Sequence, residues 1–410
     1  MPVKARSLCA ILGALSIALL AGCQTPPPPP PKPVPPPPPP VVKLAPHQLT
    51  QDEPQFLRLA NMDKTKTPLR VGVILPFTNS SPGTRAIATG MLKAAQLALY
   101  DSGRSDIVLM TADDNAAKPQ EAASAAEKLL NQGAEVLIGP LFAASVTAVA
   151  PVARDRGVPV LAFSTDRSVA GDGVYLLSFQ PQSEVGRVVA YAIGQGHKNF
   201  AALVPSTSYG QLAEQAFRKE VKDGGGAVVS VEHFSPGSGA VMNQTSAIAK
   251  SGADAVFIPQ GGTLLRSIAP TLAYNGVDPT KVKLLGTGSW DDPAIAREPA
   301  LRDGWFAAPA PDADRGFVSK YRAAFGAAPP QLAALAYDAV SLIALLGGGK
   351  PYQRFTPAAL TDPNGFSGVD GIFRFNADGS IERGLSVLSI RPGGFETISP
   401  APTTFQGKGS

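Results

Sequence analysis

The chain has 410 residues and a formal charge of +4, a bias too small to predict a nucleic-acid-binding protein. Its only cysteines are Cys9 and Cys23, and it has three histidines. Neither a disulfide framework nor a cysteine–histidine metal site is therefore expected, and no other cofactor is predicted.

Residues 1–22 have the pattern of a secretory signal peptide. Lys4 and Arg6 precede an apolar run over 8–20, which is too short for a comfortable membrane span. Residues 20–23, Leu-Ala-Gly-Cys, resemble the lipobox of bacterial lipoproteins. The resemblance implies cleavage before Cys23, lipidation of its thiol and tethering to a membrane. Gln24, in place of an aspartate, suggests sorting to the outer membrane, with the protein facing the periplasm.

The segment 23–68 is predicted to be a linker. Thirteen of the fifteen residues at 26–40 are prolines, which favour polyproline II because they fix φ and donate no backbone hydrogen bond. At about 3.1 Å per residue, such a tract spans roughly 45 Å. The rest, 41–68, is expected to extend the linker or to form one weak helix.

From residue 69 onwards, short β-branched runs alternate with helical patterns. Strands are expected at 69–75, 107–110, 136–138 and 158–163, separated by helices near 87–99, 121–132 and 143–156. A second unit of the same kind has expected strands at 200–204, 227–231, 255–258 and 282–285. Two helices are expected at 314–325 and 331–346, and two strands around the turn at Asp378. This rhythm predicts doubly wound α/β lobes.

Several motifs resemble type I periplasmic binding proteins, most closely their branched-chain amino-acid receptors. They are 71–77 (Val-Gly-Val-Ile-Leu-Pro-Phe), Gly90, 138–140 (Ile-Gly-Pro), 157–159 (Gly-Val-Pro) and 371–379. The resemblance implies two Rossmann-like lobes joined by three crossings, expected at 176–184, 304–312 and 362–370. Lobe 1 is accordingly predicted to comprise 69–180 plus 308–365, and lobe 2 to comprise 181–307 plus 366–400.

In that family the ligand lies between loops that follow the strands. Mapping the motifs places these candidates at the expected cleft: Phe77, Thr78, Ser164, Thr165, Asp166, Arg167, Tyr209, Gln260 and Trp290. The amino-acid recognition pattern is broken, because Ala143 stands at the usual hydroxyl position and no acid precedes Asp291 in its loop. For Asp166 and Arg167 a solvated pair that caps the next turn is favoured over a ligand contact, and Trp290 is more often a packing or lobe-contact residue than a stacking platform.

No catalytic constellation appears, since there is no nucleophile elbow, phosphate-binding loop or histidine cluster. Two non-enzymatic functions remain. The lipid anchor, stiff linker and broken cleft favour a regulator resembling the penicillin-binding-protein activator lipoproteins, whose partners are peptidoglycan synthases. Residues 73–78, followed by 86–91, resemble the segment of that family that leads from the first strand into the first helix. The alternative is a solute-binding receptor for amino acids or a related small polar ligand, with an ABC permease as partner.

Overall fold

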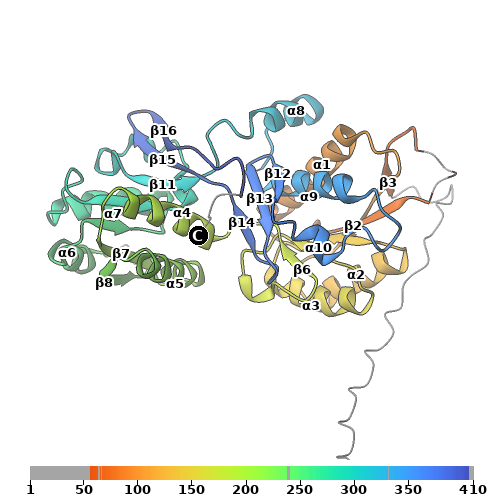
Figure 1. Ribbon diagram of the computed structural model, residues 1–410, viewed down its shortest axis with the longest axis horizontal. Coiled ribbons are helices and arrows are strands. Elements are labelled where there is room, and N and C mark those ends of the chain that lie inside the picture. The colour runs from red at the N-terminus through yellow and green to blue at the C-terminus, as the bar shows by residue number, and fades with distance from the viewer. Residues whose placement is uncertain (1–55, 63–64, 66, 238–240, 331, 406–410) are drawn as a thin grey trace, which may run out of the picture. The chain divides into compact units, whose positions relative to one another are not determined.

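A computed structural model describes residues 56–62, 65, 67–237, 241–330 and 332–405. The signal peptide, Cys23 and the proline tract lie outside the described residues, so the expectations for them remain predictions. The described chain forms two α/β lobes, each with a central sheet between helices (Figure 1). Within the described residues, no helix combines the length and apolarity needed to cross a membrane.

Lobe 1 contains a six-stranded sheet of order β1-β3-β2-β4-β5-β6. Its strands are β1 (Phe56–Arg58), β2 (Leu69–Leu75), β3 (Ile107–Asp113), β4 (Val136–Ile138), β5 (Val160–Ala162) and β6 (Val174–Leu176). All neighbours pair in parallel except β1, which joins β3 antiparallel. All seven residues of β2 are buried, as a central strand covered on both faces requires.

Helices cover both faces of this sheet. They are α1 (Pro82–Ser102), α2 (Pro119–Asn131), α3 (Ala143–Asp155), α8 (Arg315–Phe325), α9 (Ala333–Leu346) and the short α10 (Pro357–Leu360). One apolar core joins the sheet to α1, α8 and α9, and a second joins it to α2 and α3. Helix α1 begins where the Ser81 side chain accepts from the amide of Thr84 at 3.4 Å, and ends at Gly103, whose φ of 62° suits glycine.

Lobe 2 contains a seven-stranded sheet of order β16-β15-β11-β10-β9-β7-β8. Its strands are β7 (Asn199–Pro205), β8 (Ala227–Phe234), β9 (Ala255–Phe257), β10 (Lys283–Gly286), β11 (Trp305–Ala308), β15 (Ser386–Arg391) and β16 (Gly394–Ser399). Its helices are α4 (Pro181–Gly194), α5 (Ser208–Asp223), α6 (Met242–Lys250) and α7 (Gly262–Tyr274), with 3-10 turns η2 (Gly288–Trp290), η3 (Ile295–Arg297) and η4 (Pro299–Leu301). Two apolar cores fill its faces.

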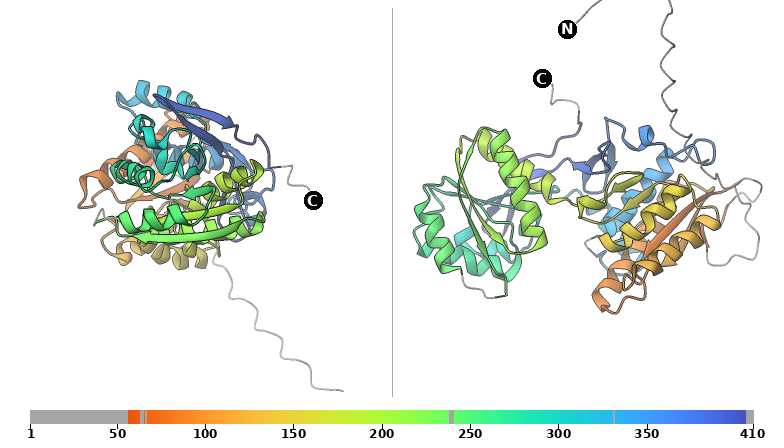
Figure 2. Two further views of the ribbon diagram at one scale, coloured as in Figure 1. Left: turned by 90° about the vertical axis from the view of Figure 1, so that its left-hand side faces the viewer. Right: turned by 90° about the horizontal axis from the view of Figure 1, so that it is seen from below.

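The C-terminal strands divide between the lobes, which corrects the predicted boundary at 366. A separate sheet of β12 (Phe366–Gly368), β13 (Gly371–Phe375) and β14 (Ile381–Arg383) packs on lobe 1, where Phe375 lies 5.5 Å from the Tyr175 ring. Only β15 and β16 join the sheet of lobe 2. Each lobe thus combines distant parts of the chain, as the mixed colours in Figure 2 show.

Three short segments connect the lobes. The first, 177–180, lies between β6 and α4, and the second, 309–314, lies between β11 and α8. The third lies at 384–385, between β14, which packs on lobe 1, and β15, which pairs in lobe 2. The expected third crossing at 362–370 was wrong, because the aromatic strands after Phe366 bury their rings in the core of lobe 1.

The predicted linker also ends earlier than expected. Phe56 pairs with Met110 across the β1–β3 ladder and is 6% exposed in the core of lobe 1. Residues 56–58 therefore belong to the folded lobe rather than to a linker reaching residue 68, and they form a strand where a weak helix was considered.

Candidate functional site

Loops at the carboxyl ends of the parallel strands carry most of the predicted site residues. In α/β sheets this edge is where ligands bind, because helix N-termini and loop side chains converge there. Lobe 1 contributes the loops after β2, β4 and β5, and lobe 2 contributes the loops after β7, β9 and β10.

In the loop after β2, Phe77 and Thr78 are largely engaged within lobe 1. Phe77 is half-buried against the lobe core. Thr78 is exposed, but its amide and hydroxyl both donate to the carboxylate of Asp113, at 3.3 and 2.5 Å. After β4, Phe142 stands 41% exposed just before α3, next to Ala143 at the position where a hydroxyl residue was sought.

The loop after β5 does not contain an Asp–Arg ion pair. Ser164 is buried and accepts from the amide of Asp166 at 3.1 Å, while Thr165 is exposed. Asp166 caps the turn η1 (Arg167–Val169) by accepting from the amide of Ser168 at 2.9 Å. Arg167 instead reaches Asp378 at 2.6 Å, which ties the loop to the β13–β14 turn. Asp166 therefore caps the next turn, as the sequence analysis considered, but it does so without Arg167 as its partner.

In lobe 2, Tyr209 lies in the first turn of α5. Thr207 caps that helix by accepting from the amide of Gly210 at 3.1 Å, which fixes the start of the turn. Tyr209 is 37% exposed, and its hydroxyl donates to Thr287 at 2.9 Å. Burial raises the pKa of Tyr209 and nearby Glu184 raises it further, so the phenol stays protonated at neutral pH.

Trp290 is a core residue and is not available as a stacking platform in this structure. Its side chain is 0% exposed, and its indole N–H donates to the carbonyls of Ile258 at 3.2 Å and Gln260 at 3.0 Å. The Gln260 side chain turns back to the carbonyl of Gly261 at 2.9 Å. Trp290 thus fixes the loop after β9, in agreement with the packing role that the sequence analysis favoured.

Glu184 is a site residue that the sequence patterns did not identify. It lies in the first turn of α4, and its carboxylate accepts from the amide of Gly288 at 3.1 Å. It is partly buried, and desolvation by the surrounding protein raises its pKa to about 7, against the Gly288 hydrogen bond and the charge of Arg383. Because no motif marks this position, only its place beside a crossing would have signalled it.

Arg383 is the last residue of β14, directly before the third crossing, and it contacts the first crossing. Its Nε donates to the carbonyl of Ser178 at 3.0 Å, and its guanidinium lies over the Phe179 ring, 4.4 Å from the centroid. The residue is 5% exposed, and both terminal nitrogens lack a hydrogen-bond partner in the described part of the chain. The misplaced third crossing is the reason why the sequence analysis overlooked Arg383.

The charge of Arg383 lowers the pKa of two aspartates from lobe 1. Asp338 on α9 is 2% exposed and accepts from the amide of Val369 at 2.7 Å. Burial raises its pKa to about 7, although Arg383 opposes the rise. Asp370, in the β12–β13 turn, has a pKa raised to about 6 by burial, again opposed by Arg383. The junction of the lobes is therefore rich in carboxyl groups that titrate near neutrality.

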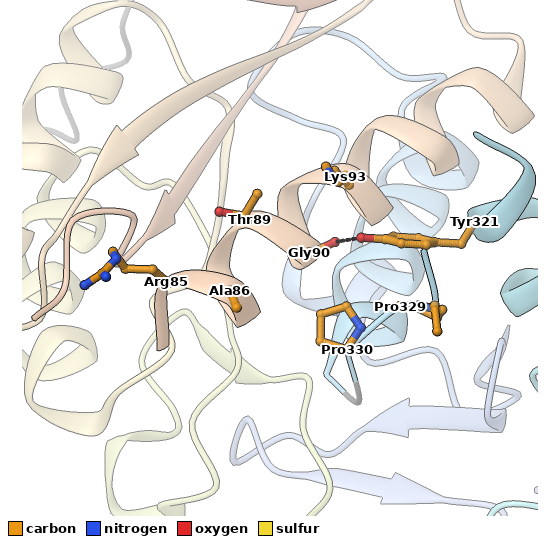
Figure 3. Close-up of a pocket in the computed structure, with 9 residues that line it drawn as sticks. Arg85, Ala86, Thr89, Gly90, Lys93, Tyr321, Pro329 and Pro330 are labelled. Atoms are coloured by element: carbon orange, nitrogen blue, oxygen red, sulfur yellow. Dashed lines mark hydrogen bonds between the residues drawn. The ribbon is translucent and has the colours of Figure 1, made fainter. Parts of the chain in front are cut away.

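A separate hollow of about 510 Å³ opens on lobe 1 between α1 and the segment before α9 (Figure 3). It forms where Pro330 packs on Gly90, whose carbonyl accepts from the Tyr321 hydroxyl at 3.3 Å. It includes none of the predicted cleft residues. In the described residues, no group of three or more histidine, cysteine, aspartate or glutamate side chains has the arrangement of a metal site.

Comparison with known proteins shows which family this chain belongs to. The sequence profile of the family described as periplasmic binding protein matches residues 68–394. The chain belongs to the periplasmic binding protein family. Among solved structures, this periplasmic binding protein is similar to a putative branched-chain amino acid ABC transporter from Rhodospirillum rubrum. That structure has a TM-score of 0.72 at 23% identity, covering 81% of this chain and 100% of the other. At this identity, the likeness shows the type I fold.

Curated relatives of this periplasmic binding protein point in two directions. A Leu/Ile/Val-binding protein homolog 6 of Brucella melitensis is 27% identical over 54% of this chain and 58% of its own length. Penicillin-binding protein activator LpoA of Vibrio antiquarius is 24% identical over 41% of this chain and 28% of its own. An uncharacterized protein, RP748 of Rickettsia prowazekii, is 21% identical over 38% of this chain and 40% of its own. The matches span less than two thirds of each of these relatives.

Proposed function

We propose that this protein is the solute-binding receptor of an ABC importer, with a small polar ligand bound between its lobes. The observation that carries the proposal is the arrangement of the segments that connect the two lobes. Three short crossings connect two lobes, and accessible polar side chains, including Tyr209 and Glu184, gather at the strand ends beside them. A hinge beside a polar site is what a receptor that closes on its ligand needs.

The comparisons support this function over a regulatory one. The similar solved structures include solute-binding proteins of ABC transporters, and the matched family profile covers most of the chain. The match to LpoA covers a smaller part of the sequence. The partner in this proposal is an ABC permease, the location is the periplasm, and the role is binding rather than catalysis.

The ligand-binding sequence pattern of an amino-acid receptor is altered, so a different solute is proposed. Ala143 stands at the usual hydroxyl position after β4, and the hydroxyl of Thr78 is committed to Asp113. Thr165, Tyr209 and the half-exposed Gln260 remain as polar candidates at the strand ends. Such a set suits a polar ligand without the carboxylate contacts of a leucine receptor.

A thermal-shift screen of the purified protein tests this proposal. A panel of amino acids, amines, sugars and aromatic acids is added at millimolar concentration. One chemical class is expected to raise the melting temperature by several degrees, because ligands that bind only the native state stabilise it. A flat response to every class would contradict the receptor function.

The second candidate is a lipid-anchored activator of a penicillin-binding protein. The match to LpoA favours it, as do the predicted lipidation of Cys23 and the proline-rich segment that follows. In this case the partner is a peptidoglycan synthase, and the protein is held at the outer membrane. Labelling with a radioactive lipid precursor tests the anchor: incorporation should disappear in Cys23→Ala.

A further inference from the structure

After its last strand, the chain returns from lobe 2 to lobe 1. Strand β16 ends at Ser399, which pairs with Val387 in the sheet of lobe 2. Residues 400–405 then run back along the third crossing and reach the sheet of β12 and β13 that packs on lobe 1. This segment, 400–405, is called the C-terminal strap here. It adds a further contact between the lobes to the three covalent crossings.

The base of the strap is fixed to lobe 2 by Arg187 on α4. The Nη2 of Arg187 donates to the Ser399 hydroxyl at 2.6 Å and to the carbonyl of Pro400 at 3.1 Å. Its Nε donates to the carbonyl of Leu385, in the third crossing, at 2.8 Å. Because hydrogen bonds from a charged donor are stronger than neutral ones, this one side chain holds the start of the strap firmly beside the hinge.

The middle of the strap lies against the third crossing. The amide of Ala401 donates to the hydroxyl of Ser386 at 3.1 Å. Pro402 packs so closely on Gly384 that a Cβ at Gly384 would lie 3.1 Å from the Pro402 carbonyl oxygen. Pro400 and Pro402 each fix their own φ and keep the preceding residue extended. The segment is therefore stiff and has little slack.

The tip of the strap is seated on lobe 1. The partly buried ring of Phe405 lies over the guanidinium of Arg374 on β13, with the ring centroid 4.6 Å from the guanidinium carbon. Arg374 is itself held in place, because it donates to Glu382 at 2.7 Å and to the carbonyl of Pro363 at 3.0 Å. Gly365 leaves room for the ring, since a Cβ there would lie 2.6 Å from Cε2 of Phe405. The seat of Phe405 is thus built from residues of lobe 1.

Rotation of one lobe against the other moves the seat relative to the base. The strap cannot extend far to follow this movement, because six residues span at most roughly 20 Å when fully extended. A stiff segment held at both ends therefore resists hinge motion until Phe405 leaves its seat. A partly exposed cation–π contact favours the docked state over the released state by only about two- to fivefold, so thermal motion is enough to open the seat.

We propose that the C-terminal strap is a releasable restraint on the hinge between the lobes. While Phe405 is seated on Arg374, the strap holds the lobes in one arrangement. When the ring leaves its seat, the lobes rotate more freely about the three crossings. This role follows from contacts between the lobes and requires no particular ligand or partner, so it applies to a receptor and to an activator alike.

Distance measurements by pulsed electron paramagnetic resonance test the proposal. Spin labels are attached at Lys128→Cys on α2 and Gln215→Cys on α5, two exposed helix positions in different lobes. The full chain is used, with Cys9→Ala and Cys23→Ala so that the labels occupy the only thiols. Phe405→Ala should increase the population outside the main distance peak about two- to fivefold, because it removes the cation–π contact. An unchanged distance distribution would overturn the proposal.

Two matched substitutions in the strap serve as controls. Phe405→Tyr keeps an aromatic face over Arg374 and should preserve the original distance distribution. Thr403→Ala changes an exposed strap residue and should also leave the distribution unchanged. If Thr403→Ala broadened the distribution as much as Phe405→Ala, the seat of Phe405 would not be the restraint.

A truncated chain and a melting curve separate a hinge restraint from simple packing. Removal of residues 402–410 keeps the bond from Ala401 to Ser386 but deletes the tip, so it should broaden the distance distribution at least as much as Phe405→Ala. The melting temperature of each variant is measured alongside. A lower melting temperature with unchanged distances would show that Phe405 only stabilises lobe 1, and would overturn the restraint.

Discussion

The Nε of Arg383 donates to the carbonyl of Ser178 at 3.0 Å, and this bond joins the end of β14, directly before the third crossing between the lobes, to the first crossing. The side chain also stacks over Phe179 and Phe373, with ring centroids 4.4 and 5.6 Å away. One buried cation thus ties the first connecting segment to the strands that lead into the third.

Replacing Arg383 should destabilise the protein. Arg383→Met leaves Asp338 without its compensating charge and removes the bond to Ser178, so the free energy of unfolding should fall by about 3 kcal/mol. Urea denaturation measures the loss. Arg154→Met is the control, because Arg154 makes an exposed pair with Asp172, and its loss should cost less than about 1 kcal/mol. Similar losses in both variants would show that Arg383 has no special role.

Stability should depend on pH through Glu184 and Asp338. Both pKa values are raised to about 7, above their unfolded values of 4.5 and 3.8, so the folded state binds more protons in between. Stability should consequently rise as pH falls from 8 towards 5. Glu184→Gln should flatten this rise in the melting temperature. An unchanged slope would contradict the assignment.

Asp378 should act in the opposite direction at lower pH. Burial would raise its pKa, but hydrogen bonds from Ser380 and the charge of Arg167 outweigh it and hold the value at about 2. Its contribution to stability is present above pH 4 and is lost as pH falls through about 2. Asp378→Asn should therefore lower the melting temperature at pH 6 more than at pH 2.5. A difference of the same size at both pH values would argue against the ion pair with Arg167.

Trp290 offers a test of packing against ligand stacking. Trp290→Phe leaves the carbonyls of Ile258 and Gln260 without their indole donor, which should cost about 1–3 kcal/mol of unfolding free energy. Chemical denaturation measures this loss. Normal stability combined with lost solute binding would restore the stacking interpretation.

Gly90 should tolerate no side chain. A Cβ there would lie 2.1 Å from Cγ of Pro330, so Gly90→Ala should destabilise lobe 1 by about 1–3 kcal/mol, as overpacking does. Gly83→Ala is the matched control in the same helix, because the nearest atom would be 3.8 Å away. If both variants unfold at the same temperature, the close approach of Pro330 has no energetic importance.

The sequence predicted the elements well where burial leaves a periodic signature. The strand at 69–75 matches β2 residue for residue, because a central parallel strand is apolar on both faces. The third crossing was misplaced because the aromatic run after Phe366 fits either lobe, and only tertiary packing shows that Phe373 and Phe375 enter the core of lobe 1.

The site was harder to predict than the fold. Glu184 and Arg383 belong to no motif, and 199 positions separate them in the sequence, so the arrangement beside the crossings is purely tertiary. Trp290 was selected for its residue type, but the direction of its side chain depends on the carbonyls it meets. Asp166 was resolved correctly as a cap because that role is local.

Cross-linking in native membranes tests the proposed function most directly. The full-length protein is cross-linked in its own cells, and its partners are identified by mass spectrometry in the presence and absence of the solute found by the thermal-shift screen. An ABC permease is expected, enriched when the solute is present. Recovery of a penicillin-binding protein instead, independent of solute, would contradict the receptor function and support the activator.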